Sequence, residues 1–370
     1  MYFILSPCGT SLLTNQSKQE ERQLIFRYAN VKEPREIPDS DRQKLDQIKN
    51  RVQEQLLAAG SDYVRVARLS AELNGIIKFY GHRLPARSDV HFLLSTDTYL
   101  GNVTAQLVKE WLEVQGGKFV VQVHRQTDLR TVDIVSFQLA LSDLVRKLSE
   151  EIPEYLRRGY KIVFNLTGGF KSIQGFLQSI ANFYADETIY IFETSDDLLR
   201  IPKLPVRLDA TQIISENLLT FRRLALDLPV SPEDVRKIPE TLLLIYDGQI
   251  TLSPWGVIMW KEAKKKLYGQ QILASPDEGK VRLSKKFMKR CKELPPERKI
   301  LINERIDQLI KHLIKKDYNP SSLDFKELKG KPKADSTHEM DAWSDGDARR
   351  MFGHFEGKTF ILDSLDKGLH

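Results

Sequence analysis

Cysteine is scarce in this chain, since Cys8 and Cys291 are the only two among 370 residues. Two residues this far apart cannot build a disulfide framework. The sequence also has no Cys-x-x-Cys pair and no Cys/His cluster with zinc spacing. Chains so poor in cysteine are typical of reducing compartments, so we expect a cytoplasmic protein without a structural metal site.

Long apolar runs without breakers are missing as well. The most apolar long window, 241–260, contains two glycines, a proline and an aspartate, which argues against a membrane-spanning helix. The apolar start, 1–5, has no basic segment before it and breaks at Pro7, so we expect neither a signal peptide nor a membrane partner. With 29% charged and 41% hydrophobic residues, the composition is that of an ordinary globular protein.

Acidic residues are under-represented in one stretch of the chain. The whole sequence has 56 Lys and Arg against 50 Asp and Glu, a net charge of +6. Residues 261–333 contain 21 basic and 10 acidic residues, an excess of 11, so the remainder carries a net −5. This asymmetry predicts that only one part of the protein meets a polyanion.

Apolar runs alternate with helical patterns over the first two hundred residues. Five short runs predict strands, at 2–5, 91–94, 119–123, 160–165 and 188–193. Between them apolar residues recur at helical spacing, as in 39–59. The order predicts an α/β fold class, with a Rossmann-like domain over 1–205 that has a parallel sheet and helices on both faces.

Prolines punctuate the chain after residue 200, where the alternation ends. We predict a small middle module, 206–274, which connects the domains and is either winged-helix-like or a docking site for the ribosome. It should hold a helix over 211–226 and a turn at Asp247-Gly248.

The third predicted domain, 275–370, is small and α+β. Its expected elements are helices at 284–293 and 297–316, then strands at 325–328, 349–355 and 359–365. Three domains agree with the chain length.

Three loops follow predicted strands at the edge where parallel sheets bind ligands, at 8–11, 95–98 and 167–172. They supply hydroxyls and backbone N–H groups, and the third enters a helix beside Lys171. A Walker P-loop does not fit, because Phe170 and Asn165 stand where it needs glycine. The loops predict phosphate or nucleotide contact without ATP hydrolysis; a plain glycine turn is the alternative.

The segment from Asn165 to Lys171, together with Gly9-Thr10-Ser11, resembles the CARF domains of CRISPR-associated effectors. These are Rossmann-like homodimers that bind cyclic oligoadenylates and thereby switch on an attached effector. The resemblance implies a homodimer with cyclic tetra-adenylate as its activator and no catalytic cofactor. The ligand site it implies consists of Gly9, Thr10, Ser11, Ser95, Thr96, Gly168, Gly169 and Lys171.

Cations crowd the start of the third domain. This density predicts a nucleic-acid surface, whereas a solvated helix face is the alternative. The residues expected to contact RNA are Lys285, Lys286, Lys289, Arg290 and Arg349.

Two helices followed by an antiparallel sheet, with an Arg349-Arg350 pair and a Glu356-Gly357 turn, resemble the RelE/HigB family of ribosome-dependent mRNA endonuclease toxins. The family implies metal-independent RNA cleavage by 2′-OH attack, with Arg350 as the central arginine and Arg349 on the opposite face of the strand. Its usual Glu-x-Arg strand is not matched at His338-Glu339-Met340. The candidate catalytic residues are Arg350, Lys326, Lys329, Lys367, His338 and His354.

Together these features predict a ligand-gated endoribonuclease of type III CRISPR defence that cuts mRNA on the ribosome and inhibits translation. A second hypothesis is a non-enzymatic regulator that binds DNA, although a lysine-rich helix suits phosphates better than bases. A third is a ribosome-independent RNase of the HEPN type. That type uses an arginine closely followed by a histidine, here Arg349 or Arg350 with His354.

Overall fold

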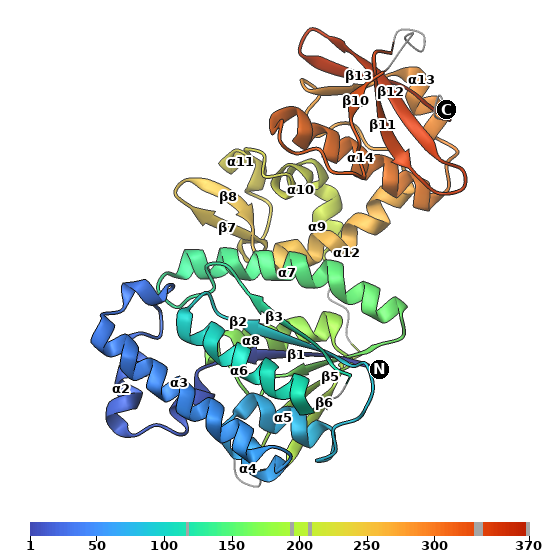
Figure 1. Ribbon diagram of the computed structural model, residues 1–370. Helices are drawn as coiled ribbons and strands as arrows, with labels where there is room; N and C mark the ends of the chain where they lie inside the picture. Colours follow the sequence, from blue (N-terminus) through green and yellow to red (C-terminus); the bar gives the residue numbers. More distant parts are fainter. Residues whose placement is uncertain (116–117, 193–195, 206–208, 329–335, 368–370) are drawn as a thin grey trace. The chain divides into compact units, whose positions relative to one another are not determined.

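The computed structural model describes the chain except for residues 116–117, 193–195, 206–208, 329–335 and 368–370 (Figure 1). The chain forms two compact units, an amino-terminal unit Met1–Arg207 and a carboxyl-terminal unit Leu208–His370. The division lies close to the boundary predicted at 205. The predicted middle module and the predicted third domain belong to the same unit.

The amino-terminal unit is a Rossmann-like α/β fold, as the alternation of strands and helices predicted. Its six-stranded sheet has the order β3-β2-β1-β4-β5-β6. The strands are β1 (Tyr2–Cys8), β2 (Val90–Ser95), β3 (Val120–Arg125), β4 (Lys161–Asn165), β5 (Glu187–Ile191) and β6 (Leu198–Pro202). Strands β1 to β5 are parallel, whereas β6 pairs antiparallel with β5. The sequence did not predict β6, because this edge strand is largely exposed and its apolar residues are interrupted by Arg200.

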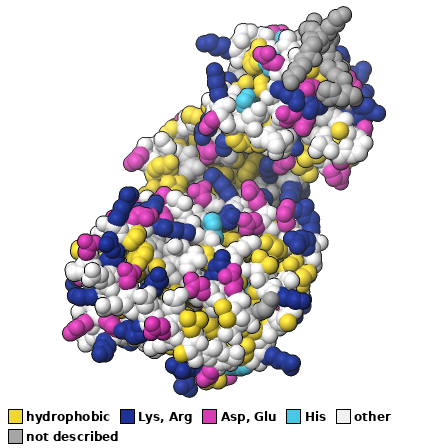
Figure 2. Space-filling model, in the orientation of Figure 1, with side chains coloured by type: hydrophobic (Ala, Val, Ile, Leu, Met, Phe, Trp, Pro, Cys, Tyr) yellow, Lys and Arg dark blue, Asp and Glu magenta, His cyan; other side chains and the backbone are white. Residues whose placement is uncertain are grey.

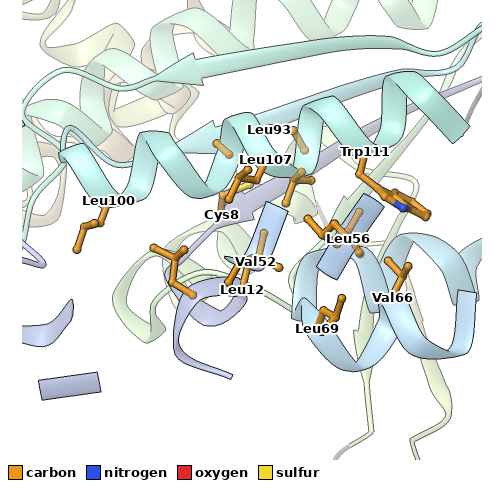
Figure 3. Packing of buried hydrophobic residues seen from close by; sticks show 14 of the residues in the cluster. Cys8, Leu12, Val52, Leu56, Val66, Leu69, Leu93, Leu100, Leu107 and Trp111 are labelled. Atoms are coloured by element: carbon orange, nitrogen blue, oxygen red, sulfur yellow. The ribbon is translucent and has the colours of Figure 1, made fainter. Parts of the chain in front are cut away.

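Helices cover both faces of this sheet. They are α1 (Ser11–Thr14), α2 (Gln19–Arg27), α3 (Asp39–Ala59), α4 (Tyr63–Leu69), α5 (Ala71–Phe79), α6 (Tyr99–Gln115), α7 (Ile134–Arg157) and α8 (Lys171–Tyr184). Residues of α1 to α6 form one core with Cys8 and Leu93, in which Leu107 and Trp111 of α6 take part (Figure 3). On the other face α7 packs against the sheet, with the ring of Tyr155 4.6 Å from that of Phe3.

The carboxyl-terminal unit begins with small elements. They are α9 (Thr211–Glu216), α10 (Leu218–Ala225), α11 (Pro232–Val235), β7 (Leu243–Tyr246), β8 (Gln249–Leu252) and α12 (Pro254–Gln270). Asp247 and Gly248 have φ angles of 46° and 73° and make the predicted two-residue turn between β7 and β8. The single helix predicted over 211–226 is two helices that meet at Asn217.

The rest of this unit is a second sheet with two helices. Its elements are β9 (Val281–Leu283), α13 (Lys285–Cys291), α14 (Pro296–Ile314), β10 (Lys326–Glu327), β11 (His338–Trp343), β12 (Arg349–Glu356) and β13 (Thr359–Asp366). The strand order is β10-β11-β12-β13-β9. Ile306 and Ile310 of α14 share a core with Met340 and Met351, so one face of this sheet is covered. The sequence did not predict β9 and β11 as strands.

One core joins the two parts of the carboxyl-terminal unit. Leu228 and Ile272 belong to the same buried cluster as Val281 and Ile306. The side-chain amide of Asn303 on α14 also donates to the backbone carbonyl of Tyr268, 3.0 Å away. The segment predicted to connect two domains is therefore packed into this unit. No helix in the described part of the chain combines the length and the apolar character of a membrane span.

Candidate functional sites

The three predicted ligand loops leave the same edge of the amino-terminal sheet. Cys8 is in register with Ser95, and β1 also pairs in parallel with β4, so the carboxyl ends of β1, β2 and β4 are neighbours. The loops after β1 and β4 touch, because a Cβ atom placed on Gly9 would lie 3.2 Å from the Cα atom of Gly169. Gly169 has a φ angle of 88°, which favours glycine.

A buried carboxylate from α5 binds these loops together. Glu72 is 0% exposed. Its Oε1 atom accepts hydrogen bonds from the backbone N–H groups of Gly9 at 2.9 Å and Gly169 at 3.3 Å. Its Oε2 atom accepts from the hydroxyls of Ser11 at 2.9 Å and Ser70 at 2.8 Å. Four donors thus surround the two oxygens, as a carboxylate removed from water requires.

This geometry changes the role expected for the glycines. The sequence predicted that the N–H groups of Gly9 and Gly169 contact a ligand phosphate, but in the structure they donate to Glu72. A Cβ atom on Gly168 would lie 2.4 Å from the Cδ atom of Glu72, so this glycine makes room for the same carboxylate. A glycine-rich loop has the same sequence signature whether its amides meet a ligand or an anion of the protein itself.

Nothing in the sequence analysis pointed to Glu72. The available signal was its position two residues after Ser70, the residue that caps α5. A glutamate in the first turn of a helix is usually an exposed capping residue, so this signal was weak.

The remaining predicted ligand residues differ in accessibility. Ser95 is buried, and its hydroxyl donates to the carbonyl of Thr96 at 2.9 Å. The hydroxyl of Thr96 shares a hydrogen bond with that of Thr98, also at 2.9 Å. Thr10 is partly exposed, and Lys171 is exposed at the start of α8. Lys171 and Thr10 are therefore the predicted residues best placed to meet a ligand.

A cavity of about 410 Å³ lies beside α5 and the end of α1. Its volume is within the range of small-molecule sites. Its polar lining includes Asn15, Asn74, Arg68, Lys78, His82 and Asp196. The Nζ atom of Lys78 lies 2.6 Å from the Oδ2 atom of Asp196. The cavity thus offers both cations and amides next to the helix that carries Glu72.

In the carboxyl-terminal unit, the predicted catalytic Arg350 is bound to three carboxylates. Its Nη2 atom lies 3.1 Å from Asp341 and 3.2 Å from Asp324, and its Nη1 atom donates to Glu339. The hydrogen bond from Lys326 lowers the pKa of Asp324, whereas desolvation raises that of Asp341. Both predicted cations, Arg350 and Lys326, are paired with acids, so a phosphate would have to replace these partners.

The two predicted histidines have different surroundings. His338 stacks on Phe325 with ring centroids 5.2 Å apart, and burial lowers its pKa. The Nδ1 atom of His354 lies 2.8 Å from the Oδ2 atom of Asp363, and this hydrogen bond raises the pKa of the imidazole. The hydroxyl of Ser336 donates to the same carboxylate oxygen at 2.8 Å. A partly exposed imidazole oriented by a carboxylate is suited to proton transfer.

Four of the five predicted RNA-binding residues form an exposed basic surface on α13, whereas Arg349 lies on β12. Phe287 and Cys291 face the core, whereas the cations of the helix are exposed, namely Lys285, Lys286, Lys289 and Arg290. Arg349 contacts Asp347 and lines a small cavity with Arg290, away from the partners of Arg350. This confirms that the adjacent arginines lie on opposite faces of β12. On the visible face of the amino-terminal unit, by contrast, basic and acidic side chains are interspersed (Figure 2).

Two lysines complete the set of predicted catalytic residues. Lys367 is exposed just after β13. Lys329 lies outside the described residues. Within the described ranges, no three His, Cys, Asp or Glu side chains are grouped in a way that could hold a metal ion.

Part of the amino-terminal unit is similar to a family of CRISPR-associated proteins. Residues 67–204 match the model of a family described as CRISPR-associated protein (Cas_APE2256). The matched range includes Glu72 and the loops after β2 and β4, but not the loop after β1. No curated protein matches the chain. The similarity of this part of the amino-terminal unit supports a CRISPR-associated protein.

Proposed function

We propose that this chain is a cyclic-oligoadenylate-activated endoribonuclease of type III CRISPR defence that cuts mRNA on the ribosome. The observation that carries the proposal is the combination of two units in one chain. One matches a CRISPR-associated family and has ligand loops at its sheet edge. The other has an exposed basic helix and a sheet that carries Arg350.

The amino-terminal unit would be the sensor, acting as a homodimer. A ring of repeating phosphates suits a two-fold interface, since each subunit supplies the same groups. Because Glu72 already accepts from Gly9 and Gly169, the first contacts of cyclic tetra-adenylate would be with Lys171 and Thr10. Closer contact with the glycine amides would require the carboxylate of Glu72 to leave them.

The carboxyl-terminal unit would cut RNA without a metal ion. The 2′-oxygen attacks the adjacent phosphorus, and the bond from phosphorus to the 5′-oxygen breaks. A base takes the proton of the 2′-OH, and an acid gives a proton to the departing 5′-oxygen. His354, oriented by Asp363, is suited to one of these transfers. Arg350 would stabilise the charge on the phosphate oxygens after exchanging its carboxylate partners for the phosphate.

The decisive experiment is mRNA cleavage in a purified translation system, with and without cyclic tetra-adenylate. Wild-type protein should produce fragments only when ligand and ribosomes are both present, and Arg350→Ala should abolish them. Arg236→Ala, a change at an 80% exposed side chain far from β12 in sequence, is the matched control. If the complete system yields no fragments, or if Arg350→Ala cuts like wild type, the proposal is wrong.

A non-enzymatic DNA-binding regulator is the second candidate. The hairpin of β7 and β8 follows short helices, an order that winged-helix modules share. A gel-shift with promoter DNA distinguishes the candidates, because a nuclease of this type needs no duplex DNA affinity.

A further inference from the structure

A small cavity of about 200 Å³ lies between the end of α13 and the ends of β11, β12 and β13. Its apolar side consists of Trp343 and Leu365, which are buried, and Leu294, which is partly buried. This volume is below the usual range of pockets for complete small molecules. A single flat ring is therefore a better occupant than a whole nucleotide or cofactor.

The indole of Trp343 forms a rigid wall of this cavity. Its Nε1–H group donates to the backbone carbonyl of Asp347 at 2.7 Å. The guanidinium of Arg298 lies over the ring, 4.5 Å from its centroid, and is itself bound to Asp345 at 2.6 Å. Arg298 holds one face of the indole and the hydrogen bond to Asp347 holds one edge. The side chain of Trp343 is therefore already fixed and would lose little conformational entropy when a ligand enters the cavity.

The exposed side of the cavity carries charged groups of both signs. Two arginines, Arg290 and Arg349, stand beside two carboxylates, Glu293 and Asp347. Arg349 and Asp347 form an ion pair at 3.0 Å, so this pair would have to open before either group could bind RNA. Guanidinium groups bind phosphate oxygens, whereas carboxylates repel phosphate and accept hydrogen bonds from amino groups. Arg290 also belongs to the basic surface of α13, so a polyanion held there would reach this cavity.

We propose that this cavity is a base subsite for single-stranded RNA. Of adenine, cytosine and uracil, it prefers the two that carry an exocyclic amino group, adenine and cytosine, because this group can donate to Glu293 or Asp347 while neighbouring phosphates lie on Arg290 and Arg349. Uracil has no amino group, and the carbonyl oxygens on either side of its ring N–H are disfavoured by the carboxylates. The inference rests on the proposed RNase function, for which it supplies a base preference.

The subsite holds the RNA and does not take part in cleavage. Arg349 and Arg350 lie on opposite faces of β12, so the cavity and the cluster around Arg350 are separate sites on one strand. A base bound at the first site would fix which nucleotide of the chain can reach the second.

Binding of fluorescently labelled hexamers of A, C and U to the full-length protein tests the inference. The A and C hexamers should bind at least about fivefold more tightly than the U hexamer. Glu293→Gln and Asp347→Asn should each reduce this difference. Arg290→Ala should weaken all three hexamers equally and lower the salt dependence of binding by about one phosphate contact. Arg236→Ala is the control for a lost surface cation, and the melting temperature of each variant checks its folding.

Equal binding of the three hexamers, or full discrimination in Glu293→Gln and Asp347→Asn, would overturn the base subsite. Cleavage in the translation system would still support the proposed function in that case. If discrimination is observed but mRNA is never cut, the subsite stands and the proposed nuclease activity is wrong.

Discussion

Arg222 and Asp307 form a buried ion pair, in which the Nη2 atom of the arginine lies 2.6 Å from the Oδ1 atom of the aspartate. The hydroxyl of Tyr268 donates to the other carboxylate oxygen. The pair joins α10 to α14, two helices that the sequence analysis assigned to different domains. The carboxyl-terminal unit should therefore unfold as one cooperative body.

Asp307→Ala should lower the free energy of unfolding of this unit by about 3–5 kcal/mol, because the guanidinium of Arg222 would stay buried without a counter-charge. Urea denaturation followed by tryptophan fluorescence measures the change. Glu233→Ala removes the exposed ion pair with Arg236 and should alter stability by less than about 0.5 kcal/mol. Equal effects of the two substitutions would contradict the importance of the buried pair.

Glu72→Ala should speed up hydrogen exchange at the amides of Gly9 and Gly169, since both lose their acceptor. The free energy of unfolding should fall by about 2–4 kcal/mol, because buried donors are left unpaired. Exchange measured by NMR or mass spectrometry reports both amides directly. Glu154→Ala, on the exposed side of α7, should leave them unchanged.

Gly168→Ala should destabilise the amino-terminal unit by about 1–3 kcal/mol, because the added Cβ atom would overlap the held side chain of Glu72. Gly175→Ala is the matched control, since outside its chain neighbours and its own helix backbone no atom lies within 4 Å of its Cβ position, and alanine favours the helix. Thermal unfolding of the two variants should move in opposite directions. A neutral Gly168→Ala variant would mean that the carboxylate can shift at little cost.

The two histidines of the second sheet should titrate on opposite sides of the ordinary histidine pKa. The pKa of His354 is raised by its hydrogen bond with Asp363, and that of His338 is lowered by burial. The stabilisation from His354 is thus present at pH values below about 6.5 and is lost as the pH rises through its raised pKa. NMR titration of the imidazole protons resolves the two groups. Asp363→Asn should lower the pKa of His354 and leave the pKa of His338 unchanged.

The strands β1 to β5 could be predicted because each contains a short apolar run between helical patterns, although β3 is only partly buried. The edge strand β6 is largely exposed and its apolar residues are interrupted by Arg200, and β11 carries Glu339 and Asp341 on one face, so neither has an unbroken apolar run. The opposite orientations of Arg349 and Arg350 followed from the two-residue period of a strand.

Partners that come from distant parts of the chain could not be predicted. Gly9 and Gly169 lie 63 and 97 residues from Glu72 in the sequence, and only the folded sheet edge brings them to its carboxylate. The acids around Arg350 come from a loop and from β11, and each is an ordinary surface residue by sequence alone. The sequence shows that position 350 carries a cation, but only the folded structure shows which carboxylates Arg350 contacts.

The common core of the carboxyl-terminal unit also limits which segments of the chain could be exchanged between genes. A recombination that moved only residues 275–370 would leave behind Arg222 and Tyr268, the partners of Asp307. The smallest segment that could be inherited intact therefore starts near Leu208, where the unit begins. In related genes, a junction between the two units should fall at that position, with the small helices and the hairpin inherited together with the second sheet.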